Sequence, residues 1–343
     1  MGQRTSPVFL WSNGVPTDLA STTAVELIDF ERVDSLDHVL ILAASWEERC
    51  LGMTRRIGNY TCGTVALSVY DGKSELREEH LKELRRRLPL VGRLEEIPAL
   101  HSNPLANVIK TIRLVRQTAQ GKPPRLSIDI STFTRKHLLQ LLLGLDTEGL
   151  LGSCRFFHTE PEDYDTRDNS SIAEGISNVK AIEAFAGSNT PSKDSVLIMF
   201  LGYEGTRALA LWEHLEPNRT IAIIPDPPYK EAWRGRTEDQ NRYLLSCLPK
   251  KHVFRSSAVE LLETDALLKR LCSMRTFDAK KYKYQIAPFG TKPQTVGIYK
   301  FWRSNPGLAT IMYASPTRYR SERASFPPGR TWYLGSSQSW TGT

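Results

Sequence analysis

The sequence lacks the cysteine pattern of a disulfide-stabilised or zinc-binding protein. Its five cysteines contain no Cys-x-x-Cys pair, and its seven histidines do not have the spacing of metal ligands. We therefore expect reduced, buried thiols in a cytoplasmic protein that holds no metal and no cofactor. The cysteines are Cys50, Cys62, Cys154, Cys247 and Cys272.

Long apolar runs are also missing. The longest, around Leu138 to Leu143, is far shorter than the roughly 20 residues of a membrane helix. The first residues contain no apolar core of the kind found in a secretory signal, so we expect no membrane partner. Apolar residues make up 40% and charged residues 24% of the 343 residues, which indicates a globular chain with room for two domains.

The common nucleotide-binding motifs do not occur. No Gly-x-Gly-x-x-Gly follows the first apolar strand, and no Gly-x-x-x-x-Gly-Lys-Ser/Thr is present. The bulky residues after the two strongest apolar strands, at 45–49 and 202–206, would keep a dinucleotide pyrophosphate away from the backbone. These absences argue against an ordinary NAD-dependent dehydrogenase and against a P-loop enzyme.

An excess of positive charge is present instead. The net charge is +7, and basic residues gather at 85–87, 280–283 and 318–320. Such an excess favours anionic partners, either nucleotides or nucleic acid. A solvated basic surface is the alternative interpretation, and we prefer it for the helical cluster at 85–87.

Apolar strands alternate with helices of about ten to fifteen residues, which is typical of parallel sheets. Predicted strands cover 39–44, 64–70, 94–97, 126–130 and 154–158, and then 196–201, 220–224, 252–255, the stretch from 282, and 309–313, with an edge strand at 331–334. We predict a helix containing Leu51, Met53 and Ile57, and a linking helix over 172–185. The predicted regions are an N-terminal arm (1–36), a first unit (37–190), a second unit (191–335) and a flexible tail (336–343).

The two halves match each other at a nearly constant offset. Four pairs of positions agree within two residues of one offset, each at the carboxyl end of a predicted strand. The pairs are Trp46-Glu47 with Tyr203-Glu204, Asp71 with Asp226, Lys136 with Lys292, and Pro161-x-x-Tyr164 with Pro316-x-x-Tyr319. We predict an α/β protein with two tandem Rossmann-like parallel-sheet units related by internal duplication.

Polar turns after the fourth strand of each unit predict an anion site, because ligands bind at the carboxyl ends of parallel strands. Backbone N–H groups, hydroxyls and cations in such a turn suit a phosphate. A cation at a helix N-terminus is unfavourable unless an anion lies beside it. The candidate residues are Asp129, Ser131, Thr132, Arg135 and Lys136 in the first unit, and Gly290, Thr291 and Lys292 in the second. Capping of the following helix is the alternative role for Asp129.

The turns after the first and second strands supply further candidates. An aromatic ring beside a Glu suits stacking on a base and a hydrogen bond to a base or sugar, although the rings could instead belong to the core. The acids after the second strands, Asp71 and Asp226, occupy the ribose-binding position of Rossmann folds or simply form turns. Candidates after the first strands are Ser45, Trp46, Glu47, Arg49, Tyr203, Glu204 and Arg207, and Glu48 with Arg49 could form a structural ion pair.

The stretch Asp129-Ile130-Ser131-Thr132-Phe133-Thr134-Arg135-Lys136, between a strand and a helix, resembles the signature of CARF domains, the CRISPR-associated Rossmann folds. It has one residue more than the usual spacing. Gly290-Thr291-Lys292 resembles the end of that signature without its Asp, and two fused units are similar to a SAVED domain. The resemblance implies a sensor of cyclic oligonucleotides in bacterial antiviral defence. Because little sequence lies outside the two units, we expect the effector to be a separate protein.

Three hypotheses follow from the sequence. In the first, the chain is a nucleotide-binding sensor or regulatory subunit of a defence system. In the second, it is a nucleotide hydrolase or glycosidase in which Glu47, Glu48 or Asp129 acts as general acid or base. In the third, it is a scaffold subunit that binds nucleic acid or a partner protein. We favour the first, which makes the chain a binding protein rather than an enzyme.

Overall fold

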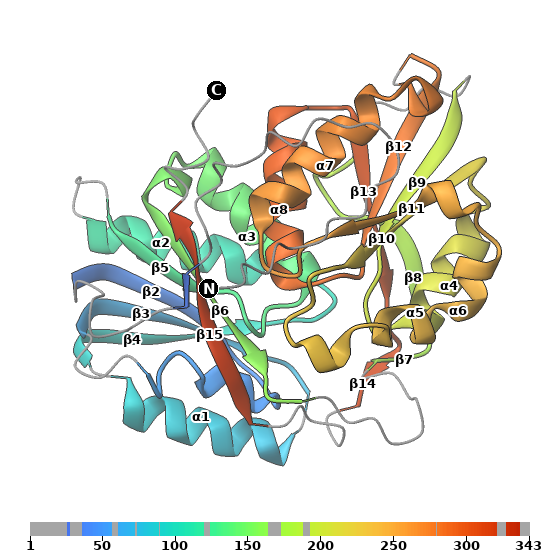
Figure 1. Ribbon diagram of the computed structural model, residues 1–343. Helices are drawn as coiled ribbons and strands as arrows, with labels where there is room; N and C mark the ends of the chain where they lie inside the picture. Colours follow the sequence, from blue (N-terminus) through green and yellow to red (C-terminus); the bar gives the residue numbers. More distant parts are fainter. Residues whose placement is uncertain are drawn as a thin grey trace, which may run out of the picture.

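The computed structural model describes most of the chain, and its elements form two parallel sheets with helices on their faces (Figure 1). The described residues are 26–27, 36–56, 61–72, 74–88, 90–119, 124–163, 173–187, 193–278, 280–320 and 327–336. Most of the predicted N-terminal arm, most of the tail, part of the linker and Tyr164 lie outside these ranges.

The first sheet has the Rossmann strand order. Its five parallel strands are arranged β6-β5-β2-β3-β4, which is 5-4-1-2-3 in chain order. The strands are β2 (Leu36–Ala44), β3 (Thr61–Tyr70), β4 (Leu90–Ala99), β5 (Leu126–Asp129) and β6 (Cys154–Pro161). The helices are α1 (Glu75–Arg87), α2 (Leu105–Ala119) and α3 (Arg135–Thr147). Residues 39–44 of β2 are at most 1% exposed, as expected for a strand covered on both faces.

The second sheet repeats that order with β11-β10-β9-β12-β13. Its strands are β9 (Asp194–Phe200), β10 (Arg219–Pro225), β11 (Val253–Ser256), β12 (Tyr282–Pro288) and β13 (Ala309–Ser315). Its helices are α4 (Gly205–Leu215), α5 (Arg236–Gln240), α6 (Arg242–Ser246), α7 (Leu261–Ser273) and α8 (Lys292–Ser304). The chain is therefore two Rossmann-like units with the same strand order, the arrangement of an internal duplication.

Short antiparallel strands extend both sheets and tie the units together. The predicted linking helix over 172–185 is wrong, because the described part of this segment forms β7 (Ala173–Glu174) and β8 (Asn178–Ala181). β8 pairs with the edge strand β13, and β7 pairs with β14 (Arg318–Tyr319). In exchange, the C-terminal β15 (Pro328–Ser336) pairs with β6 of the first sheet, and β1 (Glu26–Leu27) pairs with β15.

The helix predicted after the first strand is also wrong. The chain there forms the short 3-10 helix η2 (Glu48–Leu51) and then turns. Gly52 lies directly against the side chain of Thr159, where an added Cβ would come within 2.3 Å of the Thr159 methyl carbon. This close contact holds the turn against β6.

Helices α3 and α8 join the two units. They contact each other between the sheets (Figure 1), and one buried apolar cluster runs from the first unit into the second. At their ends, Asp146 of α3 accepts hydrogen bonds from the Tyr299 hydroxyl at 2.9 Å and from Arg303 Nε at 2.6 Å. The two sheets are thus held with their carboxyl edges toward a common space.

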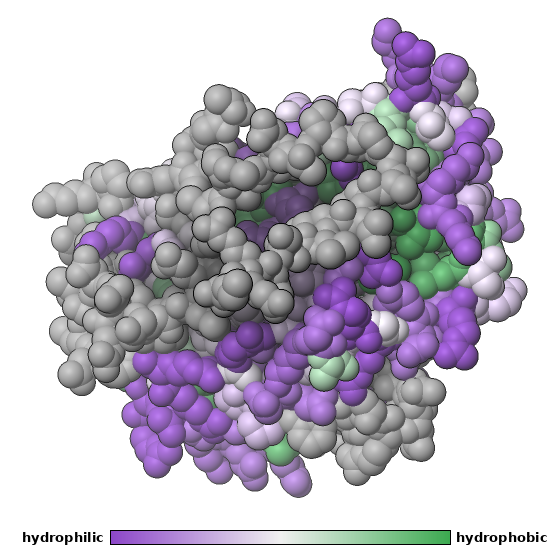
Figure 2. All heavy atoms as spheres, viewed as in Figure 1, coloured by the Kyte–Doolittle hydropathy of each residue, from purple (hydrophilic) through white to green (hydrophobic). Residues whose placement is uncertain are grey.

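The basic cluster at 85–87 belongs to a solvated helix face. Figure 2 shows hydrophilic side chains over the region of α1. Arg85 pairs with Glu96 at 2.6 Å, and Arg87 pairs with Glu83 at 2.6 Å. These ion pairs neutralise much of the local charge. Of the cysteines, Cys50, Cys62 and Cys154 are buried as predicted, whereas Cys247 is exposed.

A glycine allows α8 to pack closely on α7, and this contact can be tested. A Cβ at Gly297 would lie 2.4 Å from the Leu261 carbonyl oxygen and 2.6 Å from Thr264 Cβ. We predict that Gly297→Ala lowers the free energy of unfolding by about 1–3 kcal/mol through overpacking. Urea denaturation measures the change. Gly152→Ala is the matched control, because nothing lies within 4 Å of its added Cβ. Equal stabilities of the two variants would contradict this account.

Candidate functional site

Both units contribute their switch-point loops to one cavity. The loops after β2 and β5 line it from the first unit, and the loops after β9 and β12 line it from the second. These are the strand pairs at which the order of each sheet reverses, where Rossmann-type folds bind ligands. The cavity has a volume of about 150 Å³. The predicted residues that line it are Ser45, Trp46, Glu47, Arg49, Thr132, Arg135, Tyr203, Glu204, Arg207, Gly290, Thr291 and Lys292.

The cavity wall carries more positive than negative charge. Its acidic side chains are Glu47 and Glu204, and its basic side chains are Arg49, Arg135, Arg207 and Lys292. With all six ionised, the formal excess is two positive charges. Glu47 pairs with Arg49 at 2.7 Å. Glu204 pairs with Arg207 at 2.8 Å and with Arg135 at 3.3 Å. The fourth cation, Lys292, has no hydrogen bond or ion pair among the described residues. The wall therefore lacks the anionic charge that would balance it.

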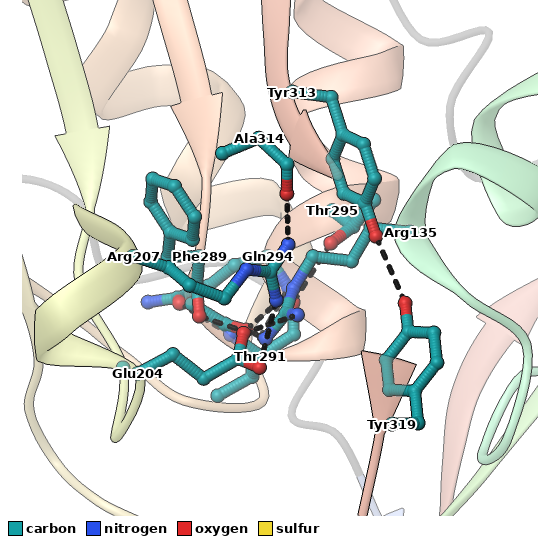
Figure 3. Close-up of polar contacts among 12 residues, drawn as sticks. Arg135, Glu204, Arg207, Phe289, Thr291, Gln294, Thr295, Tyr313, Ala314 and Tyr319 are labelled. Carbon is teal, nitrogen blue, oxygen red and sulfur yellow. Dashed lines mark hydrogen bonds and ion pairs between the residues drawn. The ribbon is translucent and has the colours of Figure 1, made fainter. Parts of the chain in front are cut away.

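Arg135 connects the two units across the cavity (Figure 3). Its Nη2 atom donates to the carbonyl oxygens of Phe289 at 2.7 Å and Gly290 at 2.6 Å, and its Nη1 atom approaches Glu204. Arg207, which is 2% exposed, donates to the Ala314 carbonyl oxygen and so ties α4 to the end of β13. Both arginines are therefore partly engaged in holding the wall.

The structure corrects one pairing of the duplication. Thr134 caps α3 and Thr291 caps α8, and 291 − 134 = 157. The strand registers agree with this offset to within one residue: Ile41 pairs with Ile128 and Ile198 pairs with Ile286, and 198 − 41 = 157 whereas 286 − 128 = 158. Arg135 directly follows the cap of α3, as Lys292 directly follows the cap of α8, so the counterpart of Lys292 is Arg135. Lys136 lies one residue further along α3.

Lys292 is the first residue of α8 and projects into an unfavourable environment. A positive charge there opposes the helix dipole. Desolvation lowers the pKa of the Lys292 ammonium well below its usual value, and the nearby Arg135 and Arg49 lower it further. The carboxylates Glu47 and Glu204 act in the opposite direction with smaller effect. An anion in the cavity would relieve this repulsion.

The start of α8 offers the cavity a basic side chain rather than a set of free backbone N–H groups. A capping box uses the N–H of Thr291, which donates to Gln294 Oε1 at 3.0 Å, and the N–H of Gln294, which donates to Thr291 Oγ1 at 3.2 Å. Pro293 has no N–H to offer. The expected cradle of backbone donors is therefore largely occupied in the second unit.

Two candidates, Asp129 and Ser131, lie behind the cavity wall. Asp129 is 2% exposed and accepts hydrogen bonds from the backbone N–H of Ser131 at 3.0 Å and from the Ser131 hydroxyl. Burial raises the pKa of Asp129 to about 6. Neither residue lines the cavity, and the Ser131 hydroxyl accepts from Thr159 N–H at 2.7 Å. These groups form a buried turn in place of the predicted ligand contact.

Four further candidates point elsewhere. Glu48 pairs with Arg55 at 2.6 Å, outside the cavity. Asp226 pairs with Arg255 at 3.1 Å and with Arg234, which leaves it poorly placed for a ribose. Lys136 and Asp71 line a neighbouring cavity. Of the three carboxylates proposed as general acid or base, Glu47 is thus the one that lines the first cavity, and it is held in an ion pair with Arg49.

Several lining residues were not found from the sequence. Tyr70 ends β3, and His101 comes two residues after the end of β4. Their position at the carboxyl ends of predicted strands could therefore have identified them from the sequence. Tyr229 and Trp233 come from the long β10–β11 connection, and the Tyr229 hydroxyl lies 2.9 Å from His158 Nε2 of the first unit. Their role depends on how the two units are packed, which no local pattern encodes.

No helix in the described ranges combines the length and the apolar character that a bilayer span requires. Within the same ranges, no three His, Cys, Asp or Glu side chains gather as they would around a metal ion.

Comparisons with known proteins give distant similarities. No family model matches the chain, and no curated protein matches its sequence. A protein described as a universal stress protein from Pseudomonas aeruginosa UCBPP-PA14 is similar over 82% of this chain and 94% of its own, with 12% identity and a TM-score of 0.26. A functionally unknown protein from Pseudomonas aeruginosa PAO1 covers 82% and 93%, with 12% identity and a TM-score of 0.25. The fold assignment rests on the strand order of this chain itself.

The desolvated ammonium of Lys292 leads to a stability prediction. Replacing it in Lys292→Met removes a poorly solvated ammonium that has no partner among the described residues, so we expect the free energy of unfolding to rise by about 1–3 kcal/mol in the ligand-free protein. Chemical denaturation of both proteins measures the difference. Lys283→Met on β12, outside the cavity, serves as the control. A Lys292→Met protein that is less stable than the parent would show that this ammonium has a stabilising role.

Proposed function

We propose that this protein binds a phosphate-bearing nucleotide in the cavity between its two units and acts as a sensor or regulatory subunit. The observation that carries the proposal is the unpartnered Lys292 at the point where both switch points meet. Together with Arg49 and Arg135 it gives the cavity an excess of positive charge. A phosphate group supplies two negative charges and several acceptor oxygens, which matches that excess.

The surroundings of the carboxylates favour binding over catalysis. Asp129 has a raised pKa but lies behind the wall, whereas Glu47 faces the cavity but is engaged by Arg49. A general acid needs both a suitable pKa and reach to the substrate. The side chains that face the cavity are instead suited to hold an anion in place.

Ligand binding between the units offers a way to signal. Arg135 comes from the first unit and Lys292 from the second, so one bound phosphate would contact both and stabilise a particular arrangement of the sheets. In the proposal, a separate effector protein reads that arrangement. The role in antiviral defence, with a cyclic oligonucleotide as one class of ligand, rests on the CARF and SAVED resemblance.

The low pKa of Lys292 predicts that binding takes up protons. A bound phosphate favours the charged ammonium, so the pKa of Lys292 rises on binding and affinity falls as the pH rises above its value in the free protein. Isothermal titration with pyrophosphate and ADP, repeated in Tris and HEPES, measures the proton uptake from the difference in heat. Lys292→Met should abolish this difference and weaken binding by about 10- to 100-fold.

Chromatography of the same mixtures separates a sensor from an enzyme. Recovery of intact ADP supports the sensor, and its consumption supports the enzyme hypothesis instead. Lys283→Met should bind as the parent does. If the parent protein binds neither pyrophosphate nor any nucleotide, the proposed function is wrong.

A further inference from the structure

A second and larger cavity adjoins the first. It lies at the carboxyl ends of β3 and β4 in the first unit and of β13 in the second, and its volume is about 540 Å³ against about 150 Å³ for the first. Small-molecule sites typically measure about 300–1,000 Å³. The first cavity is thus large enough for phosphate groups but too small for a whole nucleotide, whereas the two together fall within that range.

A wall of aromatic rings separates the two cavities and lines both. It consists of rings from the ends of three neighbouring strands of the first unit, and Tyr319 from the second unit packs on them. Tyr70 and His101 are stacked with ring centroids 4.4 Å apart, and Tyr319 lies 4.9 Å from His101 and 5.5 Å from Trp46. These spacings leave no room for another ring between them, so a planar ligand group would stack on the face of the wall.

The wall contains polar atoms without partners. Trp46 Nε1 and His101 Nδ1 are buried and form no hydrogen bond with any residue that the structure describes. Buried polar atoms in folded proteins are normally paired, but a ligand would reach these two atoms only after the rings of the wall shift. An aromatic surface of this kind is suited to a nucleobase, whose flat face stacks on other rings.

The second cavity also offers a hydrogen-bond acceptor of its own. Arg77 lines it too, but this side chain is 9% exposed and its guanidinium is engaged by the Tyr70 carbonyl oxygen and by Glu78. The Oδ1 atom of Asp71 accepts a hydrogen bond from the backbone N–H of His101 at 2.9 Å. The other carboxylate oxygen of Asp71 has no partner among the described residues. A carboxylate oxygen in this position can accept a hydrogen bond from a sugar hydroxyl.

The cations of the second cavity are already paired with carboxylates. Lys136 and Lys180 both pair with Glu183, at 3.1 Å and 3.2 Å, and Arg318 pairs with Glu174 at 2.5 Å. In contrast to the first cavity, no unpaired ammonium faces this space within the described ranges. The second cavity is therefore better suited to an uncharged group than to another phosphate.

We propose that the second cavity binds the nucleoside half of a nucleotide whose phosphates lie at Lys292, with the base stacked on the aromatic wall and the sugar at Asp71. This inference rests on the proposed function, because it assigns the two halves of one ligand to the two cavities. It makes the ligand a nucleotide with its base and sugar attached, rather than a free phosphate or polyphosphate.

Two variants of the second cavity test the proposal. Asp71→Asn keeps an oxygen for the His101 N–H but removes the charge, and Tyr319→Leu removes a ring of the wall. We expect each to weaken binding of ADP by about 5- to 100-fold, the effect of losing one stacking or charged hydrogen-bond contact, and to leave the affinity for pyrophosphate unchanged. Titration calorimetry gives both affinities, and GDP and UDP show whether the base is distinguished.

Matched controls are available outside both cavities. Asp278 also accepts a backbone N–H, from Lys280 at 2.9 Å, and Tyr243 is 63% exposed. Asp278→Asn and Tyr243→Leu should bind ADP as the parent does. If pyrophosphate binds the parent as tightly as ADP, or if the two cavity variants bind ADP normally, the second cavity does not hold the nucleoside. If neither pyrophosphate nor ADP binds the parent, the proposed function fails together with this inference.

Discussion

The packing of α3 against α8 brings the switch points of the two sheets together. Each helix follows the fourth strand of its own sheet, and its N-terminus lies at the switch point of that sheet. Because the helices contact each other and share a buried apolar cluster, the two N-termini are brought to one cavity. The contact of Asp146 with Tyr299 and Arg303 fixes the far ends of the same pair. Two potential sites thus become one composite site.

The duplicated halves have diverged at that site in a physically meaningful way. The arginine at the start of α3 is engaged with carbonyl oxygens and Glu204 of the other unit, whereas Lys292 at the start of α8 has no partner in the part of the chain that the structure describes. The position at Arg135 has thus taken a structural role, because its contacts hold the two units together. The corresponding position at Lys292 has a basic side chain with no such contacts among the described residues. Desolvation of the Lys292 ammonium is unfavourable in the free protein, and the proposed anionic ligand would offset it. The aromatic wall occurs on the side of the first unit, which adds a further difference between the halves.

Much of the fold could be predicted from the sequence, because buried parallel strands are continuous apolar runs. The strands beginning near Val39 and Val196, and the repeated order of elements, are where the patterns place them. The segment 172–185 misled prediction, since its residues are compatible with a helix but the free edge of β13 recruits part of it as β8. The alignment of Lys136 with Lys292 failed by one residue, because helix caps and not spacing decide which side chain faces the cavity. The aromatic wall depends on contacts between distant segments, which local patterns do not contain.

We propose that two Rossmann-like units build one shared nucleotide site. The stoichiometry of nucleotide binding, measured by calorimetry with protein of known active concentration, tests this proposal. The account predicts one nucleotide for each chain, with a single affinity. Two nucleotides per chain, one for each unit, would contradict it and would mean that each sheet binds its own ligand.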